Sequence, residues 1–275
     1  MTDPMGSSPC GHEVREATVD NAQPAYDPNS AHRVGGRRLW WWLGGALVLV
    51  VVVLVASWTW VTVRGESRGG SHVVTGATDL REATFVLLDG ADVIRLRTAD
   101  LGEETYRVST PRDASLRPTV SVSDGSLLTS LRDTGRDGPA LVEVVLHEAV
   151  RWHVRLDGGA KEQHLDLRTA RLDGVELTAG AHRIELDLPP AEGTLRTLLS
   201  GGASQVVVRL AGAGPVQVRT GAGAGTVTVD GTTHSGVAGG TTFTPPDWPT
   251  TSDRYDIDAS AGVATLTVDR GDADR

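Results

Sequence analysis

The sequence predicts an all-β protein of short strands, arranged as a β-solenoid-like stack or alternatively as a β-sandwich, after one N-terminal transmembrane helix. From Ala83 onward, apolar and polar residues alternate in short runs bounded by Gly, Pro and Asp. This alternation is typical of half-buried strands. No segment of that region shows an apolar helical stripe of the length that a helix needs. A charge-free apolar run near the N-terminus predicts the membrane helix.

The N-terminal tail, residues 1–38, is rich in Pro, Gly, Ser, Asn and Asp and nearly lacks Val and Leu. Such a segment cannot bury enough apolar surface to order itself, so we expect a disordered cytoplasmic tail. The chain's single cysteine, Cys10, lies in it. The remainder of the sequence therefore has no disulfides and no thiolate chemistry.

Residues 39–63 read LWWWLGGALVLVVVVLVASWTWVTV and contain no charged residue. A helix of this length spans about 37 Å, and a bilayer core needs about 30 Å. Trp residues bracket the aliphatic centre on both sides, as they do at membrane interfaces. The exit from the run lacks a small-residue cleavage site, which favours an uncleaved anchor over a signal peptide.

The orientation follows from the flanking arginines. Arg33, Arg37 and Arg38 precede the run, whereas Arg64 and Arg68 follow it and Glu66 partly balances them. This bias places the N-terminus in the cytoplasm. We therefore expect a linker over residues 64–78 and an extracytoplasmic β domain over residues 79–275, in the cell membrane of a bacterium.

The spacing of the strands is regular. Between Trp152 and Asp230 most of the expected strands begin 8 to 12 residues apart and are joined by short glycine-containing connectors. A sandwich explains such spacing, and so does a solenoid of small repeated units. The glycine pairs and the scarcity of aromatic residues favour the solenoid, whereas residues 99–138 are less regular and either begin the stack or cap it. The expected strands start near Phe85, Val93, Thr119, Leu141, Trp152, His164, Val175, Arg183, Val206, Val216, Thr226, Tyr255 and Ala264.

The charge is concentrated in the β domain. From Gly65 onward, 30 Asp and Glu residues stand against 21 Arg and Lys residues, and the whole chain has a formal net charge of −9. An acidic surface disfavours nucleic acids and anionic lipids as partners. The ordinary interpretation of the acidity is solubility.

Three stretches carry a resemblance to known families: LDGVELTAGAHRIELDLP (172–189), GAGAGTVTVDGTTHSGV (221–237) and DRYDIDASAGVATLTVDR (253–270). The region from Ala170 to Arg270 resembles actinobacterial membrane-anchored proteins with an adhesin-like β-solenoid domain. It is also similar to the extracytoplasmic part of LiaF-like envelope-stress proteins, although those usually have several spans. The resemblance implies a β-solenoid and carries no catalytic residues.

Histidines provide the first candidate site. HEAVRWH at His147 begins like a zinc-protease motif, but its second histidine, His153, lies six residues on instead of four. His147, His153 and His164 form a metal site only if neighbouring strands bring them together, and exposed strand histidines are the ordinary alternative.

Two further motifs have an ordinary structural explanation. Asp256 and Asp258 share one strand face near Asp253, and such oxygen clusters hold Ca²⁺ in some proteins, but no known Ca²⁺ spacing is present. GAGAG at Gly221 lacks the Lys-Ser/Thr of a phosphate loop and suits a tight turn instead. We therefore assign no catalytic, cofactor-binding or metal-binding residue.

Three functions remain open at this stage. The first is a non-enzymatic envelope module that contacts another envelope protein or the cell wall. The second is an accessory sensor or regulator of envelope stress, in which the cytoplasmic tail transmits the signal. The third is a hydrolase of an envelope polymer. The sequence specifies neither a ligand nor an oligomeric state.

Overall fold

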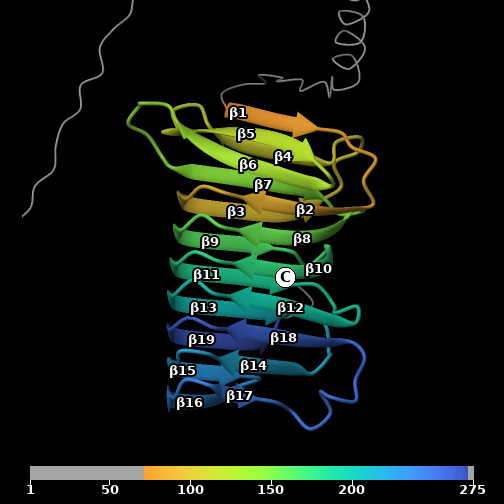
Figure 1. The fold of residues 1–275 in the computed structure, drawn as a ribbon, viewed down its shortest axis with the longest axis vertical. Coiled ribbons are helices and arrows are strands. Elements are labelled where there is room, and N and C mark those ends of the chain that lie inside the picture. The colour runs from red at the N-terminus through yellow and green to blue at the C-terminus, as the bar shows by residue number, and fades with distance from the viewer. Residues whose placement is uncertain (1–70, 272–275) are drawn as a thin grey trace, which may run out of the picture. The chain divides into compact units, whose positions relative to one another are not determined.

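The structure is a computed structural model, and it describes residues 71–271 (Figure 1). This region is all-β, as predicted, with two mixed sheets and no helix among the described residues. Across sheet A the strands run β1 (Ser71–Gly76), β4 (Tyr106–Pro111), β7 (Leu141–His147), β3 (Ala91–Ala99), β9 (Ala160–Asp166), β11 (Ala181–Leu188), β13 (Ala203–Leu210), β19 (Val263–Arg270), β15 (Ala224–Val229) and β16 (Thr232–Val237). Across sheet B they run β17 (Thr241–Phe243), β14 (Val216–Thr220), β18 (Arg254–Ala259), β12 (Thr194–Leu199), β10 (Arg171–Leu177), β8 (Arg151–Leu156), β2 (Glu82–Leu87), β6 (Ser126–Asp133) and β5 (Leu116–Ser123).

Most of the stack is built from rungs, each consisting of one strand of sheet B and the following strand of sheet A. The rungs lie in the order β6–β7, β2–β3, β8–β9, β10–β11, β12–β13, β18–β19 and β14–β15, and neighbouring rungs pair in parallel. Glu162, Arg183 and Gln205 stand side by side, so the chain advances 21 and then 22 residues between these rungs. Two predicted strands together with their turns therefore make one rung.

Antiparallel strands cap both ends of the stack. At one end β5 pairs with β6, while β4 pairs with β7 and then with β1. At the other end β17 pairs with β14, and β16 pairs with β15. Two Asp-Gly turns close the capping hairpins: Asp124 and Gly125 have φ of 48° and 74°, and Asp230 and Gly231 have φ of 46° and 79°. Positive φ at both central residues is the type I′ turn that the twist of a hairpin favours.

The order of the rungs differs from their order in the sequence at both ends. The last rung, β18–β19, lies between β12–β13 and β14–β15, and the first, β2–β3, lies between β6–β7 and β8–β9. A ten-residue connector, residues 244–253, returns the chain past β14 to this inner position. Arg254 fixes the connector because its guanidinium donates to the carbonyl oxygen of Trp248 at 3.1 Å and lies 4.3 Å from the centre of the indole ring.

Glycines form a column at the corner where sheet B turns into sheet A. A Cβ on Gly90 would lie 2.5 Å from the carbonyl oxygen of Gly159, and one on Gly180 would lie 2.9 Å from that of Gly202. Side chains at these positions would push the rungs apart, because hydrogen-bonded strands lie only about 4.8 Å from each other. The glycine pairs in the sequence are therefore a consequence of stacking one turn on another.

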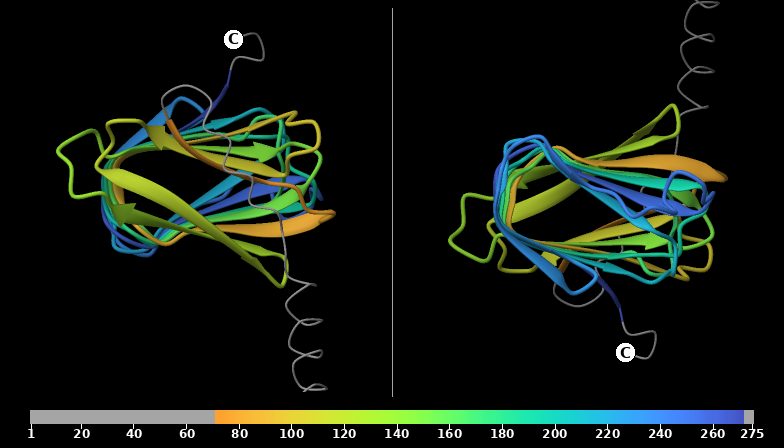
Figure 2. Two further views of the ribbon diagram at one scale, coloured as in Figure 1. Left: turned by 90° about the horizontal axis from the view of Figure 1, so that it is seen from above. Right: turned by 90° about the horizontal axis from the view of Figure 1, so that it is seen from below.

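The two sheets face each other (Figure 2). Their buried apolar side chains form one core. Inward side chains stack in columns, one of which contains Leu96, Leu165, Leu186, Val208 and Val268. Four aromatic residues, Phe85, Tyr106, Trp152 and Tyr255, are fully buried in this core. Two of them bond their polar atoms: Trp152 donates its indole N–H to the carbonyl oxygen of His147 at 2.9 Å, and the Tyr255 hydroxyl donates to that of Pro189 at 2.9 Å.

Several sequence expectations fall outside the described part of the chain. These are the tail (1–38) and the membrane helix (39–63), and no helix within residues 71–271 is long and apolar enough to span a membrane. Strand β1 lies inside the range 64–78 that we assigned to a linker. Its run SHVVTG is too short to give a clear alternating pattern, and pairing with β4 places it in sheet A. The irregular segment 99–138 contains β4, β5 and β6, which form the cap beside β7.

Gln163 is a buried polar residue in this apolar core. Its side chain is fully buried, and neither its Oε1 nor its Nε2 has a hydrogen-bond partner. An unsatisfied buried polar group costs about 1–3 kcal/mol. Gln163→Leu should therefore raise the free energy of unfolding by about 1–3 kcal/mol, measured by urea titration. Thr267→Val on the outer face of the same sheet is the control and should change it by less than about 0.5 kcal/mol; an equal effect of both variants would contradict this account.

The position of rung β18–β19, which is inserted between β12–β13 and β14–β15, leads to a second prediction. β14 and β15 pair with β18 and β19 and make no ladder to β12 or β13. Deleting residues 253–275 should therefore remove protection from hydrogen exchange throughout β14–β17 while β8–β11 stay protected. Mass spectrometry of peptides from both regions would show the difference. Persistent protection of β14 and β15 in the truncated chain would mean that they had closed onto β12 and β13.

Candidate functional site

The outer face of sheet A presents its side chains in ladders. Because neighbouring rungs are parallel and in register, each outward residue lies beside the corresponding residue of the next rung. One ladder contains Glu143, Arg95, His164, Glu185 and Val207, and a second contains Val145, Arg97, Asp166, Asp187 and Arg209. Beyond these rungs the first ladder changes to hydroxyl side chains, with Thr267, Thr228 and Thr233 in succession, whereas the second continues with Asp269 beside Arg209.

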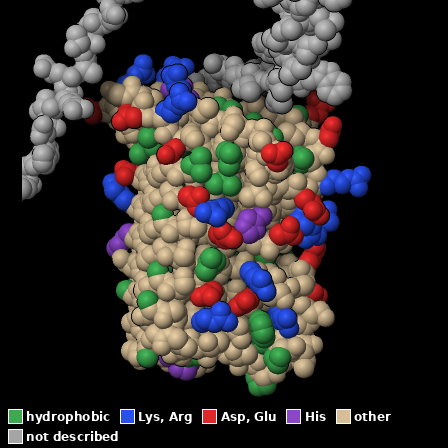
Figure 3. All heavy atoms as spheres, viewed as in Figure 1, with side chains coloured by type: hydrophobic (Ala, Val, Ile, Leu, Met, Phe, Trp, Pro, Cys, Tyr) green, Lys and Arg blue, Asp and Glu red, His purple; other side chains and the backbone are tan. Residues whose placement is uncertain are grey.

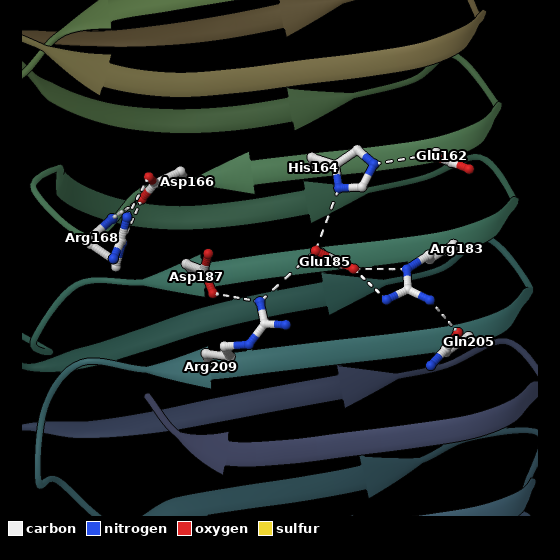
Figure 4. A network of polar contacts seen from close by, with 9 residues as sticks. All are labelled: Glu162, His164, Asp166, Arg168, Arg183, Glu185, Asp187, Gln205 and Arg209. Carbon is white, nitrogen blue, oxygen red and sulfur yellow. Dashed lines mark hydrogen bonds and ion pairs between the residues drawn. The ribbon is translucent and has the colours of Figure 1, made fainter. Parts of the chain in front are cut away.

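Ion pairs join the charged part of these ladders (Figure 4). Arg183 Nε lies 2.7 Å from Glu185 Oε1, and Arg209 reaches Asp187 at 3.1 Å. Arg168 binds Asp166 with its Nε at 2.9 Å. The hydrogen bond from Arg183 holds the pKa of the Glu185 carboxyl below its ordinary value, and Arg168 lowers the pKa of Asp166 in the same way.

Two shallow grooves cross the outer faces, one on each sheet. Groove A, on sheet A, has a volume of about 420 Å³, and its charged lining consists of Arg95, Arg97, Glu143, Asp166, Glu185 and Asp187. Groove B, on sheet B, has a volume of about 610 Å³, and its charged lining consists of Asp173, Glu176, Arg196, Arg219, Asp256 and Asp258. Charges of both signs are interspersed on the face shown in Figure 3. This arrangement suits polar, charge-bearing ligands more than apolar ones.

The three candidate histidines do not meet. His153 lies on sheet B, 3.3 Å from Glu176. His164 lies on sheet A between Glu162 at 3.1 Å and Glu185 at 3.5 Å. His147 ends β7, where its Nε2 lies 3.2 Å from the carbonyl oxygen of Gly102. Within the part of the chain that the structure describes, no three His, Cys, Asp or Glu side chains are placed to hold a metal ion.

The aspartates of DRYDID have separate roles. Asp253 accepts a hydrogen bond from the backbone N–H of Gly193 at 2.8 Å and so fixes a turn. Asp258 pairs with Arg219 at 2.9 Å on the outer face, and Asp256 stands beside Arg196 and Gln217 in the next ladder. GAGAG forms the turn into β15, where Gly221 packs against Ser260 of the inserted rung.

The charge ladders and grooves were not found from the sequence. Their signal is a recurrence of charged residues at the interval of one rung: Asp166, Asp187 and Arg209 follow one another at 21 and 22 residues. The alternation within each strand shows only that these side chains point outward. The interval of 21 or 22 residues indicates neighbouring side chains only when the strands are known to stack in register.

Comparisons with known proteins show the fold. No protein-family model matches the chain, and no curated protein matches it. A solved structure of a candidate cell adhesion protein from Clostridium sporogenes is similar, with a TM-score of 0.53 and 16% identity over 74% of this chain and 100% of that chain. A candidate adhesin from Bacteroides fragilis also matches, over 74% of this chain and 98% of that chain at 8% identity, but its TM-score of 0.27 carries no argument.

The ion pairs of sheet A predict acid sensitivity. A carboxyl whose pKa is lowered by folding stabilises the protein above its unfolded pKa, and this contribution is lost as the pH falls through the folded pKa. For Glu185 the unfolded value is 4.5. Stability should therefore fall below about pH 4.5, and Glu185→Gln should make that fall smaller. Urea titrations from pH 6 to about pH 3 would measure it. Glu103→Gln, at an exposed position without an ion pair among the described residues, is the control; identical pH profiles for Glu185→Gln and the unaltered protein would contradict the prediction.

Proposed function

We propose that this chain is a non-enzymatic, adhesin-like interaction module of the bacterial cell envelope, held on the outer face of the membrane by the helix predicted over residues 39–63. In this proposal the two-sheeted stack is a short β-solenoid with capped ends. The observation that carries the proposal is the likeness in fold to the candidate cell adhesion protein, which extends over the whole of that chain. We extend the adhesive role from that cell adhesion protein to this chain as part of the proposal.

The outer faces support this function because they are extended and polar. Charged side chains on these faces are paired within a strand, as Arg183 and Glu185 are, or along a ladder, as Arg209 and Asp187 are, so they form recognition surfaces instead of converging on one reacting atom. Among the described residues, Leu88 is the one large hydrophobic side chain that is exposed. Recognition would therefore depend on charge and hydrogen bonding more than on an apolar patch.

The test uses the full-length chain with a C-terminal tag. Protease added to intact spheroplasts should remove the tag, and the chain purified in detergent should retain cell-wall material or an envelope protein. Arg97→Glu inverts a charge in groove A and Arg196→Glu inverts one in groove B; the variant in the groove that makes the contact should lose the retained material. Arg112→Glu makes the same change at an exposed position outside both grooves and is the control.

Two outcomes would overturn the proposal. The first is a tag that survives protease on intact spheroplasts and is cleaved only after lysis. The second is a wild-type chain that retains no envelope material above the level of the empty matrix.

A further inference from the structure

Strand β16 forms an open edge at one end of sheet A. It pairs with β15 on one side, and no described strand lies on its other side. Residues Thr232 to Gly236 are exposed, and TTHSGV contains no charged residue. Figure 1 shows β16 at the end of the stack opposite to β1. An edge of this kind offers unpaired backbone groups to another strand.

The hairpin fixes which backbone groups are available. Because Asp230 and Gly231 form a two-residue turn, Val229 and Thr232 are a hydrogen-bonded pair. Hydrogen-bonded and non-hydrogen-bonded pairs alternate in an antiparallel ladder. The N–H and C=O groups of Thr233 and Ser235 therefore point away from β15. Their side chains stand on the outer face, where Thr233 and Thr228 hydroxyls lie 3.0 Å apart.

The edges of sheet B are protected, in contrast to β16. β5 has Arg117 and Pro118 within it, and β17 is only three residues long. Charge, proline and short length are the devices that prevent pairing at an edge. β16 lacks the first two, and Gly236, with φ of 64°, limits its regular part to Thr232–Ser235.

We propose that β16 pairs antiparallel with β16 of a second copy of this chain, joining two stacks end to end into one continuous sheet. A two-fold axis at His234 places Thr233 of each copy opposite Ser235 of the other, so both pairs of free backbone groups are matched. A neutral strand is complementary to itself, whereas a charged edge would repel its own copy. The acidic net charge of −9 opposes association elsewhere on the surface.

The pairing has a consequence for adhesion, and this step rests on the proposed function. Two stacks joined at β16 have their β1 strands at opposite extremes, because β1 and β16 lie at opposite ends of sheet A. Copies held in two facing membranes would meet in this way. One short strand pair is a small contact, so adhesion would depend on many copies on each surface.

The experiment measures self-association of the full-length chain in detergent by sedimentation velocity. The unaltered chain should dimerise with increasing concentration. Thr233→Lys with Ser235→Lys should weaken dimerisation about tenfold or more, and Thr233→Glu with Ser235→Glu should do the same, since each variant places like charges opposite one another. Mixing the two variants should restore a dimer that contains one copy of each.

The matched control adds the same charge to β5, the protected edge of sheet B at the other end of the stack. Ser121 and Ser123 are exposed on β5, so Ser121→Lys with Ser123→Lys should dimerise like the unaltered chain. Ser235→Pro removes a free edge N–H while leaving the ladder to β15 in place, and it should also weaken dimerisation. Circular dichroism would confirm that each variant is folded.

Three results would overturn the inference: an unaltered chain that stays monomeric up to its highest soluble concentration, edge variants that dimerise as the unaltered chain does, or a mixture that forms no mixed dimer. The measurement contains no cell-wall material and no intact membrane. Loss of envelope binding with retained self-association would therefore count against the proposed function alone, and the converse result would count against the pairing alone.

Discussion

The structure depends on the in-register pairing of parallel strands from one rung to the next. Every backbone N–H and C=O of an inner rung must find its partner on the rungs at either side, because an unpaired buried group costs free energy. This requirement imposes the same path on successive rungs, and therefore the same turn at the same corner. Gly90, Gly159, Gly180 and Gly202 follow from it, since a Cβ on Gly90 or Gly180 would displace the turn stacked against it. The core columns follow as well, because identical paths place Leu165 beside Leu186 and Leu186 beside Val208.

The same register determines the electrostatics of the outer faces. Stacking places residues of one ladder at the distance of neighbouring strands, so like charges in succession are destabilising. Asp166 and Asp187 are such a pair. Arg168 binds the carboxylate of Asp166 and Arg209 binds that of Asp187, and these two positive charges offset the repulsion between the aspartates. The lowered pKa of Asp166 has Arg168 as its main cause and indicates that this compensation is effective.

The sequence indicates the positions of the strands and turns more clearly than the spatial order of the rungs. Period-two alternation located most of the strands, and their spacing indicated short turns, because both properties depend on neighbours along the chain. The insertion of β18–β19 next to β12–β13 depends on contacts between residues far apart in sequence, such as Leu195 and Tyr255, and no local pattern encodes it. The capping hairpins had a usable signal in Asp124-Gly125 and Asp230-Gly231, since Asp-Gly between alternating runs is a strong hairpin sequence. The groove linings remained hidden because adjacency on a face requires the register of the rungs.

The inner position of the first and last rungs explains how the ends of the stack stay ordered. A cap at a free chain end can separate from the stack without disturbing anything else. Here the capping segments β4–β7 and β14–β17 each connect at both of their ends to rungs inside the stack, so neither is a free chain end, whereas β1 is held by its pairing with β4 and by its connection to β2. This topology increases the number of contacts between residues that are far apart in the sequence, and such contacts slow folding. In return it holds β16 as a fixed edge on a rigid base, with β15 bound in turn to β19. A contact made through the backbone of one strand needs such a base, because the entropy of ordering a mobile edge would exceed what so few hydrogen bonds contribute.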